Sequence, residues 1–353
     1  MNQSVTHENP MGTDGFYFVA FTSPNPQELA QQFKRLGFVV TAKHRVKQLT
    51  LFQQGDINFF ISQEQVGVAG EFAKHHGPSA FAMGFRVKDA NYAFERAVRL
   101  GATAYFGDGE GFYVPAIYGI GGSLIYLVDE SNADKVYGED FVLFQEEYSH
   151  RNNAGLTYID HLTHNVYRGN MEKWAQFYER IFNFHEIRYF NIQGKKTGLT
   201  SHALSSPCGK IRIPLNESSD ERSQIEEFLH EFHGEGIQHI ALGTEDIYTS
   251  VEKLGEQGIK FLDVPSTYYE MVSNRLPDHG EDLEKLEADH ILIDGTTKPN
   301  PKLLLQIFTQ NMLGPVFFEI IQRKGDEGFG EGNFQALFEA MELDQIRRGT
   351  LEE

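Results

Sequence analysis

The amino-acid sequence predicts an α+β fold with two domains, each made of two βαβββ units. Three observations support this prediction. Short runs rich in β-branched and aromatic residues alternate with single amphipathic helices, in the order strand, helix, three strands. The same order restarts after a polar stretch at 146–155, and one segment of the first half matches a segment of the second. We therefore expect an N-terminal domain over residues 1–150 and a C-terminal domain over residues 151–353.

The first two units are predicted in the N-terminal half. Pro26 suits the first turn of a helix, where an amide hydrogen has no helical partner, and Gly101 suits a helix end. His75 and His76 precede a Gly-Pro pair, which is typical of a loop between units. The first unit has a strand, a helix and three strands at 15–23, 25–36, 37–43, 47–53 and 56–62. The second unit has a strand, a helix and a hairpin at 79–87, 89–100 and 112–130.

The C-terminal half repeats this order, beginning with a strand at 157–166 and a helix at 170–181. Phe81–Ala102 aligns with Gln238–Ile259 at an offset of 157 residues (238 − 81 = 157). The aligned pairs include Asp89 with Asp246 and Gly101 with Gly258. This match indicates a duplication, so the N-terminal half provides an internal comparison for the C-terminal half.

The composition favours a small-molecule partner. The 353 residues include 31 Lys and Arg against 50 Asp and Glu, and the formal charge of -19 repels nucleic acid and anionic membranes. No apolar run approaches the roughly 18 residues of a spanning helix. Cys208 is the only cysteine, which excludes an intramolecular disulfide and a thiolate zinc site. The polar N-terminus lacks the segments of a signal peptide, so we expect a cytoplasmic protein.

Three candidate metal ligands occur in apolar strands of the C-terminal half: His161, His239 and Glu319. Their N-terminal counterparts cannot bind a metal; they are Ala82 for His239, Tyr126 for Glu319, and Tyr17 or Phe18 for His161, depending on a one-residue gap. A carboxylate in a buried strand is costly unless it is paired or coordinated. Each residue alone is more often an ordinary buried polar group. Together, two histidines and one carboxylate are the facial triad of non-haem Fe(II) oxygenases, so we predict one Fe(II) per chain.

Other candidate sites are weaker. His164 lies three residues after His161, so on a strand its side chain points to the opposite face. His230 and His233 fall on an acidic helix without an HExxH pattern, which indicates a solvated helix face. The glycine-rich stretch at 107–112 lacks the strand and helix that flank a dinucleotide-binding loop, so it predicts a turn.

Several motifs carry a resemblance to a known family. These are IDHLTHNV around His161, GIQHIAL around His239, LLLQIFTQ at 303–310, FFEIIQR around Glu319, and the terminal GFGEGNFQALFEA. In their order and spacing they resemble the 4-hydroxyphenylpyruvate dioxygenase family of the vicinal-oxygen-chelate superfamily. The resemblance covers nearly the whole chain, although the N-terminal half matches more loosely, in its unit pattern and in GGSLIYLVD.

The resemblance implies a glyoxalase-like barrel with the active site in the C-terminal domain. It also implies an Fe(II)-dependent reaction of 4-hydroxyphenylpyruvate with O2 that gives homogentisate and CO2, in tyrosine and phenylalanine catabolism. Because this substrate carries its own 2-oxo acid, no 2-oxoglutarate is needed. The family also favours a homo-oligomer. The catalytic polar residues that the resemblance implies are Ser201, Asn216, Gln238 and Gln306. The substrate-binding residues that it implies are Gln224, Phe308, Phe317, Phe329, Asn333 and Phe334.

Two more detailed expectations concern the aromatic residues and the C-terminus. Phe308 and Phe317 would sandwich the flat substrate ring. The terminal helix, with Asn333 as its N-cap, would close over the cavity, and the glycines at 325, 328, 330 and 332 would give it freedom to move. The alternatives are that the phenylalanines belong to an ordinary core and that the helix is an ordinary packed terminal helix.

Three other functions compete with this interpretation. A 4-hydroxymandelate synthase shares the fold, metal and substrate but hydroxylates the benzylic carbon. An extradiol ring-cleaving dioxygenase would need an acid/base histidine near the metal, and no histidine is well placed for that role. A metal-free binding protein would keep the fold without the chemistry, which the retention of all three ligand residues argues against.

Overall fold

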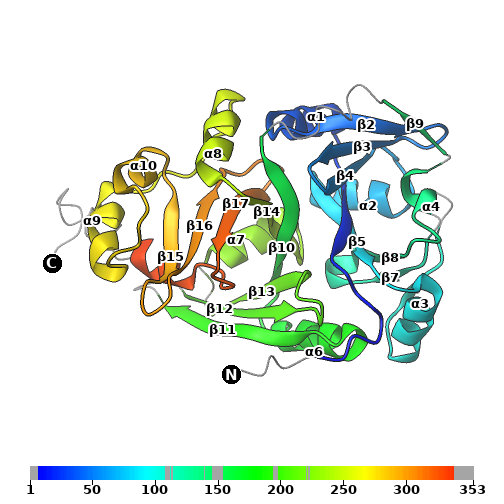
Figure 1. Cartoon of the computed structure of the whole chain (residues 1–353). Coiled ribbons are helices and arrows are strands. Elements are labelled where there is room, and N and C mark those ends of the chain that lie inside the picture. The colour runs from blue at the N-terminus through cyan, green and yellow to red at the C-terminus, as the bar shows by residue number, and fades with distance from the viewer. Residues whose placement is uncertain are drawn as a thin grey trace.

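Two large mixed β-sheets lie beside one another, each flanked by helices (Figure 1). This computed structural model describes residues 7–107, 112, 114–138, 140–144, 154–193, 198–219, 221 and 223–337. Within these ranges no helix is both long and apolar enough to cross a membrane. The predicted domain boundary near residue 150 falls in 145–153, outside the described residues.

The N-terminal half contains two βαβββ units joined by a helix. The first unit comprises β1 (Phe16–Thr22), α1 (Pro26–Arg35), β2 (Val39–His44), β3 (Leu49–Gln54) and β4 (Ile57–Ser62). The linking helix is α2 (Gly67–His76). The second unit comprises β5 (Ser79–Arg86), α3 (Ala90–Arg99), β6 (Ala104–Tyr105), β7 (Ala116–Tyr118), η1 (Ile120–Gly122) and β8 (Leu124–Val128). Two short elements follow, α4 (Asp134–Tyr137) and β9 (Phe141–Leu143).

The C-terminal half has the same organisation with a longer final connection. The third unit comprises β10 (Leu156–Val166), α6 (Met171–Phe182), β11 (His185–Gln193), β12 (Gly198–Ser205) and β13 (Arg212–Ser218). The linking helix is α7 (Gln224–Phe232). The fourth unit comprises β14 (Gly236–Thr244), α8 (Ile247–Glu256), α9 (Ser266–Arg275), α10 (Leu283–Ala288), β15 (Leu292–Thr296), β16 (Lys302–Phe308) and β17 (Phe317–Lys324). A final helical stretch covers 331–337.

The sheet topology confirms the predicted α+β fold and its duplication. The strand orders are β6-β7-β8-β5-β1-β4-β3-β2-β9 and β11-β12-β13-β10-β14-β17-β16-β15. In each unit the first strand pairs in parallel with the last. The two units of a sheet join through antiparallel pairs, β1 with β5 and β10 with β14. The C-terminal sheet curls into a half-barrel, from β11 at its lower edge to β15 at the opposite edge (Figure 1).

The offset of 157 residues recurs in the three-dimensional structure. Helix α3 begins at residue 90 and α8 at residue 247, and 247 − 90 = 157. Both helices begin the same way, since the side chain of Asp89 accepts a hydrogen bond from the Tyr92 amide and that of Asp246 from the Thr249 amide. These carboxylates satisfy amides that have no partner within the helix. The predicted repeat is therefore confirmed.

One local prediction is wrong. His75 and His76 do not lie in a loop but form the last turn of α2, which Gly77 ends with a φ of 71°. The helix begins without a side-chain cap and contains two glycines, so it lacks the usual sequence signals. A Cβ on Gly70 would lie 2.3 Å from the Gln65 carbonyl carbon, so close packing requires this glycine.

One hydrophobic core runs through both halves. The Phe59 ring of β4 lies 6.2 Å from the Phe318 ring of β17, and Phe85 lies 5.4 Å from Phe182. The buried Gln54 adds a polar tie, because its Oε1 accepts a 2.8 Å hydrogen bond from the Ala154 amide. Side chains alternate along a strand, so Phe318 faces this shared core and the next residue, Glu319, faces the interior of the C-terminal half-barrel.

Candidate metal centre

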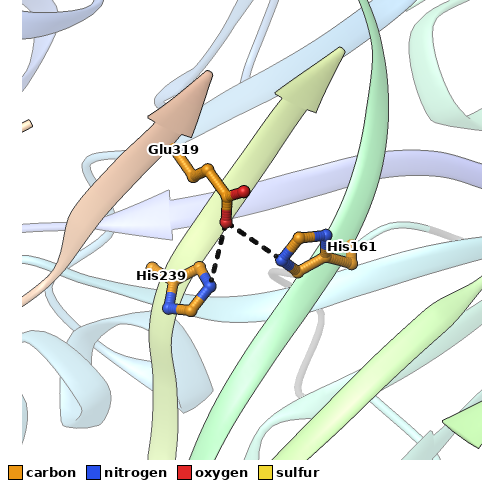
Figure 2. Close-up of side chains that lie close together, drawn as sticks. All are labelled: His161, His239 and Glu319. Carbon is orange, nitrogen blue, oxygen red and sulfur yellow. Dashed lines mark ion pairs between the residues drawn. The ribbon is translucent and has the colours of Figure 1, made fainter. Parts of the chain in front are cut away.

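The three predicted metal ligands come from three adjacent strands of the C-terminal sheet. His161 on β10 pairs with Ala241 on β14, and Ala241 pairs with Glu319 on β17. His239 precedes Ala241 by two residues, so it lies on the same face of β14. Figure 2 shows the two imidazoles and the carboxylate pointing toward one another from these strands. The strand register therefore brings together residues that are separated by about 80 positions in the chain (239 − 161 = 78; 319 − 239 = 80).

The ligand atoms converge at short distances. Oε2 of Glu319 lies 3.2 Å from His161 Nε2 and 3.4 Å from His239 Nε2 (Figure 2). All three residues are buried, and their ligand atoms lie within 4.8 Å of one another. The other imidazole nitrogens are occupied, because His161 Nδ1 lies 2.8 Å from Asp160 Oδ1 and His239 Nδ1 lies 3.0 Å from Gln238 Oε1. Both Nε2 atoms are thus directed at the carboxylate.

Electrostatics favour a positive charge between these groups. Burial alone would raise the pKa of Glu319, but His161 and His239 together outweigh burial and lower it. Burial opposes the charged form of His161, yet Glu319 and Asp160 together raise its pKa. Burial lowers the pKa of His239, which Glu319 only partly offsets. An ionised carboxylate beside imidazoles in a buried site fits a divalent cation, which would satisfy all three groups together.

The strand register also shows which of Tyr17 and Phe18 is the N-terminal counterpart of His161. His161 pairs with Ala241, and the residue 157 positions before Ala241 is Gly84 (241 − 157 = 84). Gly84 pairs with Phe18 on one side and with Tyr126 on the other, as Ala241 pairs with His161 and Glu319. Phe18 is therefore the counterpart of His161. Its ring lies 5.7 Å from the Tyr126 ring and 4.6 Å from the Phe112 ring, so an aromatic cluster fills the N-terminal equivalent of the site.

Asp160 and Arg323 form a buried ion pair behind His161. Arg323 donates from Nε to Asp160 Oδ2 at 2.7 Å and from Nη2 to Oδ1 at 2.8 Å. Burial alone would raise the pKa of Asp160, but the hydrogen bonds from Arg323 and His161 hold the pKa well below its usual range. A carboxylate behind a ligating histidine fixes the ring and its tautomer. Sequence analysis missed both residues.

The predicted polar residues Gln306 and Asn333 bond to one another, and Gln306 also bonds to the candidate ligand Glu319. Gln306 is buried, and its Nε2 donates to Glu319 Oε1 at 3.1 Å. Its Oε1 accepts from Asn333 Nδ2 at 2.9 Å. Asn333 is not the N-cap of the terminal helix, because that helix already begins at residue 331. Its side-chain oxygen instead accepts hydrogen bonds from Tyr268 at 2.6 Å and Arg275 at 3.2 Å.

Two of the terminal glycines are required by close packing. A Cβ on Gly330 would lie 1.6 Å from Gln306 Oε1, and one on Gly332 would lie 2.4 Å from Asp294 Oδ1. The Gly332 amide donates to Asp294 at 2.8 Å. These two glycines allow the segment to approach the sheet closely, and the expectation that the glycines at 325, 328, 330 and 332 give the terminal helix freedom to move stays a prediction.

The aromatic residues surround the imidazoles. Phe317 stacks on His239 with ring centroids 5.0 Å apart, and Phe329 meets His161 edge-on at 5.2 Å. The Phe308 and Phe317 rings are 6.1 Å apart and inclined by 79°, and the sandwich that they would form around the substrate ring stays a prediction. Stacking on His239 holds Phe317 in this orientation. Phe334 is half-buried on the terminal helix.

The remaining predicted residues lie on two different surfaces. Ser201 on β12 pairs with Asn216 on β13, and Asn216 pairs with Asn165 on β10. These three polar residues form a row across the strands, and the buried Asn165, which was not predicted, has no hydrogen-bond partner for its amide among the described residues. Gln224, in contrast, is exposed at the first position of α7, which packs against β10 and β13.

The other histidines lie away from the triad. His164 pairs with Leu215 and Ile237, which belong to the shared core, so it faces away from His161 as predicted. His230 and His233 are exposed at the end of α7. The glycine-rich stretch at 107–112 falls mostly outside the described residues, as do the terminal-helix positions beyond 337.

The residues that sequence analysis missed carry only weak sequence signals. Asp160 stands next to His161, so regular alternation would place it on the opposite face. The register of β10 against β14 shifts between Ile159 and His161, which removes this alternation. Arg323 follows Glu319 by four residues and therefore lies on the same face of β17, a signal that could have been used.

Comparisons with known proteins agree with this geometry. A family model described as hydroxyphenylpyruvate dioxygenase, N-terminal, matches residues 7–142, and one described as the glyoxalase/bleomycin resistance protein/dioxygenase superfamily matches residues 158–271. A 4-hydroxyphenylpyruvate dioxygenase of Legionella pneumophila is 58% identical over 350 residues, which cover 99% of each chain. A 4-hydroxyphenylpyruvate dioxygenase of Pseudomonas aeruginosa is 55% identical over 355 residues, which cover 98% of each chain.

A solved structure supports the fold. A mutant 4-hydroxymandelate synthase from Streptomyces coelicolor superposes with a TM-score of 0.78 at 25% sequence identity, over 94% of this chain and 99% of that chain. The two relatives named 4-hydroxyphenylpyruvate dioxygenase, in contrast, are more than half identical to this chain over nearly their full length, and a protein of Vibrio vulnificus named hemolysin VllY is 54% identical over 97% of this chain and 98% of that chain. The chain therefore belongs to the 4-hydroxyphenylpyruvate dioxygenase family.

Proposed function

We propose that the protein is an Fe(II)-dependent dioxygenase that converts 4-hydroxyphenylpyruvate and O2 to homogentisate and CO2. The observation that carries the proposal is the convergence of His161, His239 and Glu319 in the half-barrel whose N-terminal twin holds only aromatic and small residues there. Relatives that match this chain over nearly its full length are named 4-hydroxyphenylpyruvate dioxygenase. Iron as the metal and one ion per chain are part of the proposal.

The chain's donor set suits iron. Two neutral imidazole nitrogens and one carboxylate oxygen on one side of the ion leave further positions for substrate and O2. Iron(II) supplies electrons singly, which triplet O2 requires and closed-shell side chains cannot provide. Asp160 and Gln238 accept from the outer imidazole nitrogens, and so they direct both Nε2 atoms inward.

The remaining residues bind, orient and exclude water. Phe308, Phe317 and Phe329 give the site an apolar wall, which favours a flat aromatic ring and a low local dielectric. Gln306 lies beside the carboxylate ligand, and Ser201 and Asn216 lie in one row on adjacent strands. Their amide and hydroxyl groups are suited to the polar atoms of the substrate, and holding it in one geometry is the main task of the protein.

The test is anaerobic loading with Fe(II), followed by 4-hydroxyphenylpyruvate and O2. Oxygen uptake is followed, and the aromatic product is identified by chromatography against authentic standards. Homogentisate is the expected product. Hydroxymandelate would instead assign the protein to the reaction named for its structural neighbour, and absence of uptake with iron bound would refute the substrate assignment.

A pair of variants tests the metal site itself. Glu319→Ala removes the only carboxylate among the three ligands, so we expect iron content and turnover to fall below about 1% of the unmodified protein. Glu227→Ala on the exposed side of α7 is the control and should leave both unchanged. Cytoplasmic location and a homo-oligomeric state stay predictions, and light scattering tests the latter.

A further inference from the structure

Asp160 joins a metal ligand to an arginine. Its carboxylate is fully buried, and its Oδ1 is shared between His161 Nδ1 and Arg323 Nη2, both at 2.8 Å. Its Oδ2 accepts from Arg323 Nε at 2.7 Å. A guanidinium that binds a carboxylate through two parallel hydrogen bonds fixes both position and direction. The orientation of the His161 ring therefore depends mainly on Arg323, while Arg212 adds a longer hydrogen bond of 3.4 Å to Asp160 Oδ2 and pairs with Glu327.

The third nitrogen of Arg323 binds a turn of the backbone. Nη1 donates to the Asp326 carbonyl at 3.0 Å and to the Gly328 carbonyl at 2.8 Å. The guanidinium carbon also lies 5.9 Å from the ring centroid of Phe329, which in turn meets His161 edge-on. This turn opens the stretch from residue 325 to 337, which we call the terminal segment. Each nitrogen of the Arg323 guanidinium thus has a role in joining the metal ligand to this segment.

A second connection reaches the terminal segment by a different route. Asn333 donates to Gln306, and Gln306 donates to Glu319. Gly330 allows this approach, since any side chain there would collide with the Gln306 amide. The terminal segment therefore contacts one histidine ligand through Arg323 and Asp160, and the carboxylate ligand through Gln306.

We propose that Arg323 is a positioning residue that couples metal binding at the triad to the seating of the terminal segment on the sheet. Metal fixes the His161 ring, the ring fixes Asp160, and the rigid guanidinium transmits this arrangement to the 326–328 turn. Coupling of this kind is reciprocal, so seating the segment strengthens metal binding by the same factor. The inference rests on the metal site in the proposed function and not on the reaction catalysed there.

Hydrogen exchange and metal titration test this coupling on the full chain. The Gly332 amide donates to Asp294 on β15 and therefore reports on seating, whereas the amides of Gly328, Phe329 and Asn333 bond within the segment and report on its internal order. Anaerobic Fe(II) should slow exchange in peptides covering 325–337 by about tenfold or more. Arg323→Gln should weaken Fe(II) binding by about 10- to 100-fold, and Fe(II) should slow exchange in the terminal segment much less than in the unmodified protein, because only the connection through Gln306 remains.

The matched control is Arg188→Gln. Arg188 is half-exposed and binds the same segment from outside, with its Nε 3.0 Å from Glu331 Oε1, but it has no contact with Asp160. This variant should bind Fe(II) within about twofold of the unmodified protein. Arg323→Lys keeps the positive charge but loses the two parallel hydrogen bonds of the guanidinium, so it should recover part of the Fe(II) affinity while the exchange response stays reduced.

Two results would overturn the inference. One is an exchange rate in 325–337 that does not respond to Fe(II) in the unmodified protein, a measurement that needs no variant to fold. The other is an Arg323→Gln protein that binds Fe(II) as tightly as Arg188→Gln. If Fe(II) does not bind the unmodified chain, both the proposed metal site and this inference are refuted. Coupling without homogentisate would refute only the proposed reaction.

Discussion

Gly330 is the residue of the terminal segment that lies against Gln306, the amide that bonds to Glu319. Its φ is +74°, and a Cβ would lie 1.6 Å from Gln306 Oε1. Gly330→Ala must both strain the backbone and displace an amide that bonds to Glu319. We expect a loss of about 2 to 5 kcal/mol in unfolding free energy, together with a loss of turnover of at least tenfold. Urea unfolding and oxygen uptake provide the two measurements.

Gly209 supplies the control for Gly330→Ala. Its φ is also +74°, but it is exposed, and a Cβ added there would meet no atom within 4 Å. Gly209→Ala should therefore cost only the backbone strain, about 1 to 2 kcal/mol, and leave turnover unchanged. Equal effects of the two substitutions would show that contact with Gln306 is unimportant.

His164 should make stability depend on pH. Burial lowers its pKa to about 4 from an ordinary 6.5, so the unfolded chain takes up a proton at higher pH than the folded chain. Stability is therefore present above pH 6.5 and is lost as the pH falls from 6.5 toward 4. The residue should account for about 3 kcal/mol over this window. Urea unfolding of the metal-free protein at a series of pH values measures the slope.

A His164→Gln variant isolates this contribution. Glutamine does not titrate, so the difference in slope between the two proteins should be about 1.4 kcal/mol per pH unit within the window. In metal-free protein, protons and metal do not compete for His161, His239 and Glu319, so this competition does not affect the comparison. Parallel pH dependences for the two proteins would contradict the buried, neutral state of His164.

At the scale of elements, α3 and α8 begin with equivalent aspartates. Asp89 and Asp246 each accept a hydrogen bond from an amide in the first turn. Asp89→Ala and Asp246→Ala should each cost about 1 kcal/mol, and the double variant about 2 kcal/mol, because the two helices lie in different halves. Thermal or urea unfolding measures the effect. An iron affinity that fell with either substitution would contradict a purely capping role.

Elements with strong local signals were predictable from the sequence. Helix α1 runs from Pro26, and its N-cap and periodicity appear directly in the letters. Helix α2 lacks a side-chain cap, and the start of the terminal helix was misplaced because Asn333 suits a cap. The side-chain amide of Asn333 donates to Gln306 instead of capping the helix. The preference of asparagine for N-cap positions therefore gave the wrong start for the terminal helix, because hydrogen bonds to residues far away in the sequence determine where Asn333 lies.

The three candidate ligands were predictable because they differ in residue type from the equivalent positions of the N-terminal half. The duplication exposed His161, His239 and Glu319, because apolar strands of the other half hold aromatic and small residues at these positions. The pairing of Asp160 with Arg323 depends on a register shift in β10 and on contact between strands far apart in sequence. Neither can be derived from composition or periodicity. The ring orientations of Phe308 and Phe317 depend on packing against His239, so they could not be predicted from the sequence either.

At the scale of the whole molecule, the shared core predicts cooperative unfolding. Phe59 is fully buried in the core that runs through both halves and lies 6.2 Å from Phe318, which precedes Glu319. Phe59→Ala should cost about 3 to 5 kcal/mol in unfolding free energy. It should also weaken Fe(II) binding, because β17 loses support on the face opposite its carboxylate ligand. Calorimetry should show a single transition for the unmodified protein.

Phe60 is the matched control on the same strand. It is equally buried, but it belongs to the aromatic cluster inside the N-terminal sheet. Phe60→Ala should destabilise the protein by a similar amount while Fe(II) affinity in the folded state stays within about twofold. Two separate calorimetric transitions, or equal effects of the two substitutions on iron affinity, would refute a core that links the halves.

The shared core has a consequence for how genetic data on this protein should look. One side of β17 carries a ligand and the other is supported by the half that has none, so damage to that support is expressed as a fault in the metal site. In a random-mutagenesis screen for lost activity, harmful substitutions should scatter through the N-terminal half as well as around the triad. A map of such alleles would mark the half without ligands as essential, although the three ligand residues all belong to the other half.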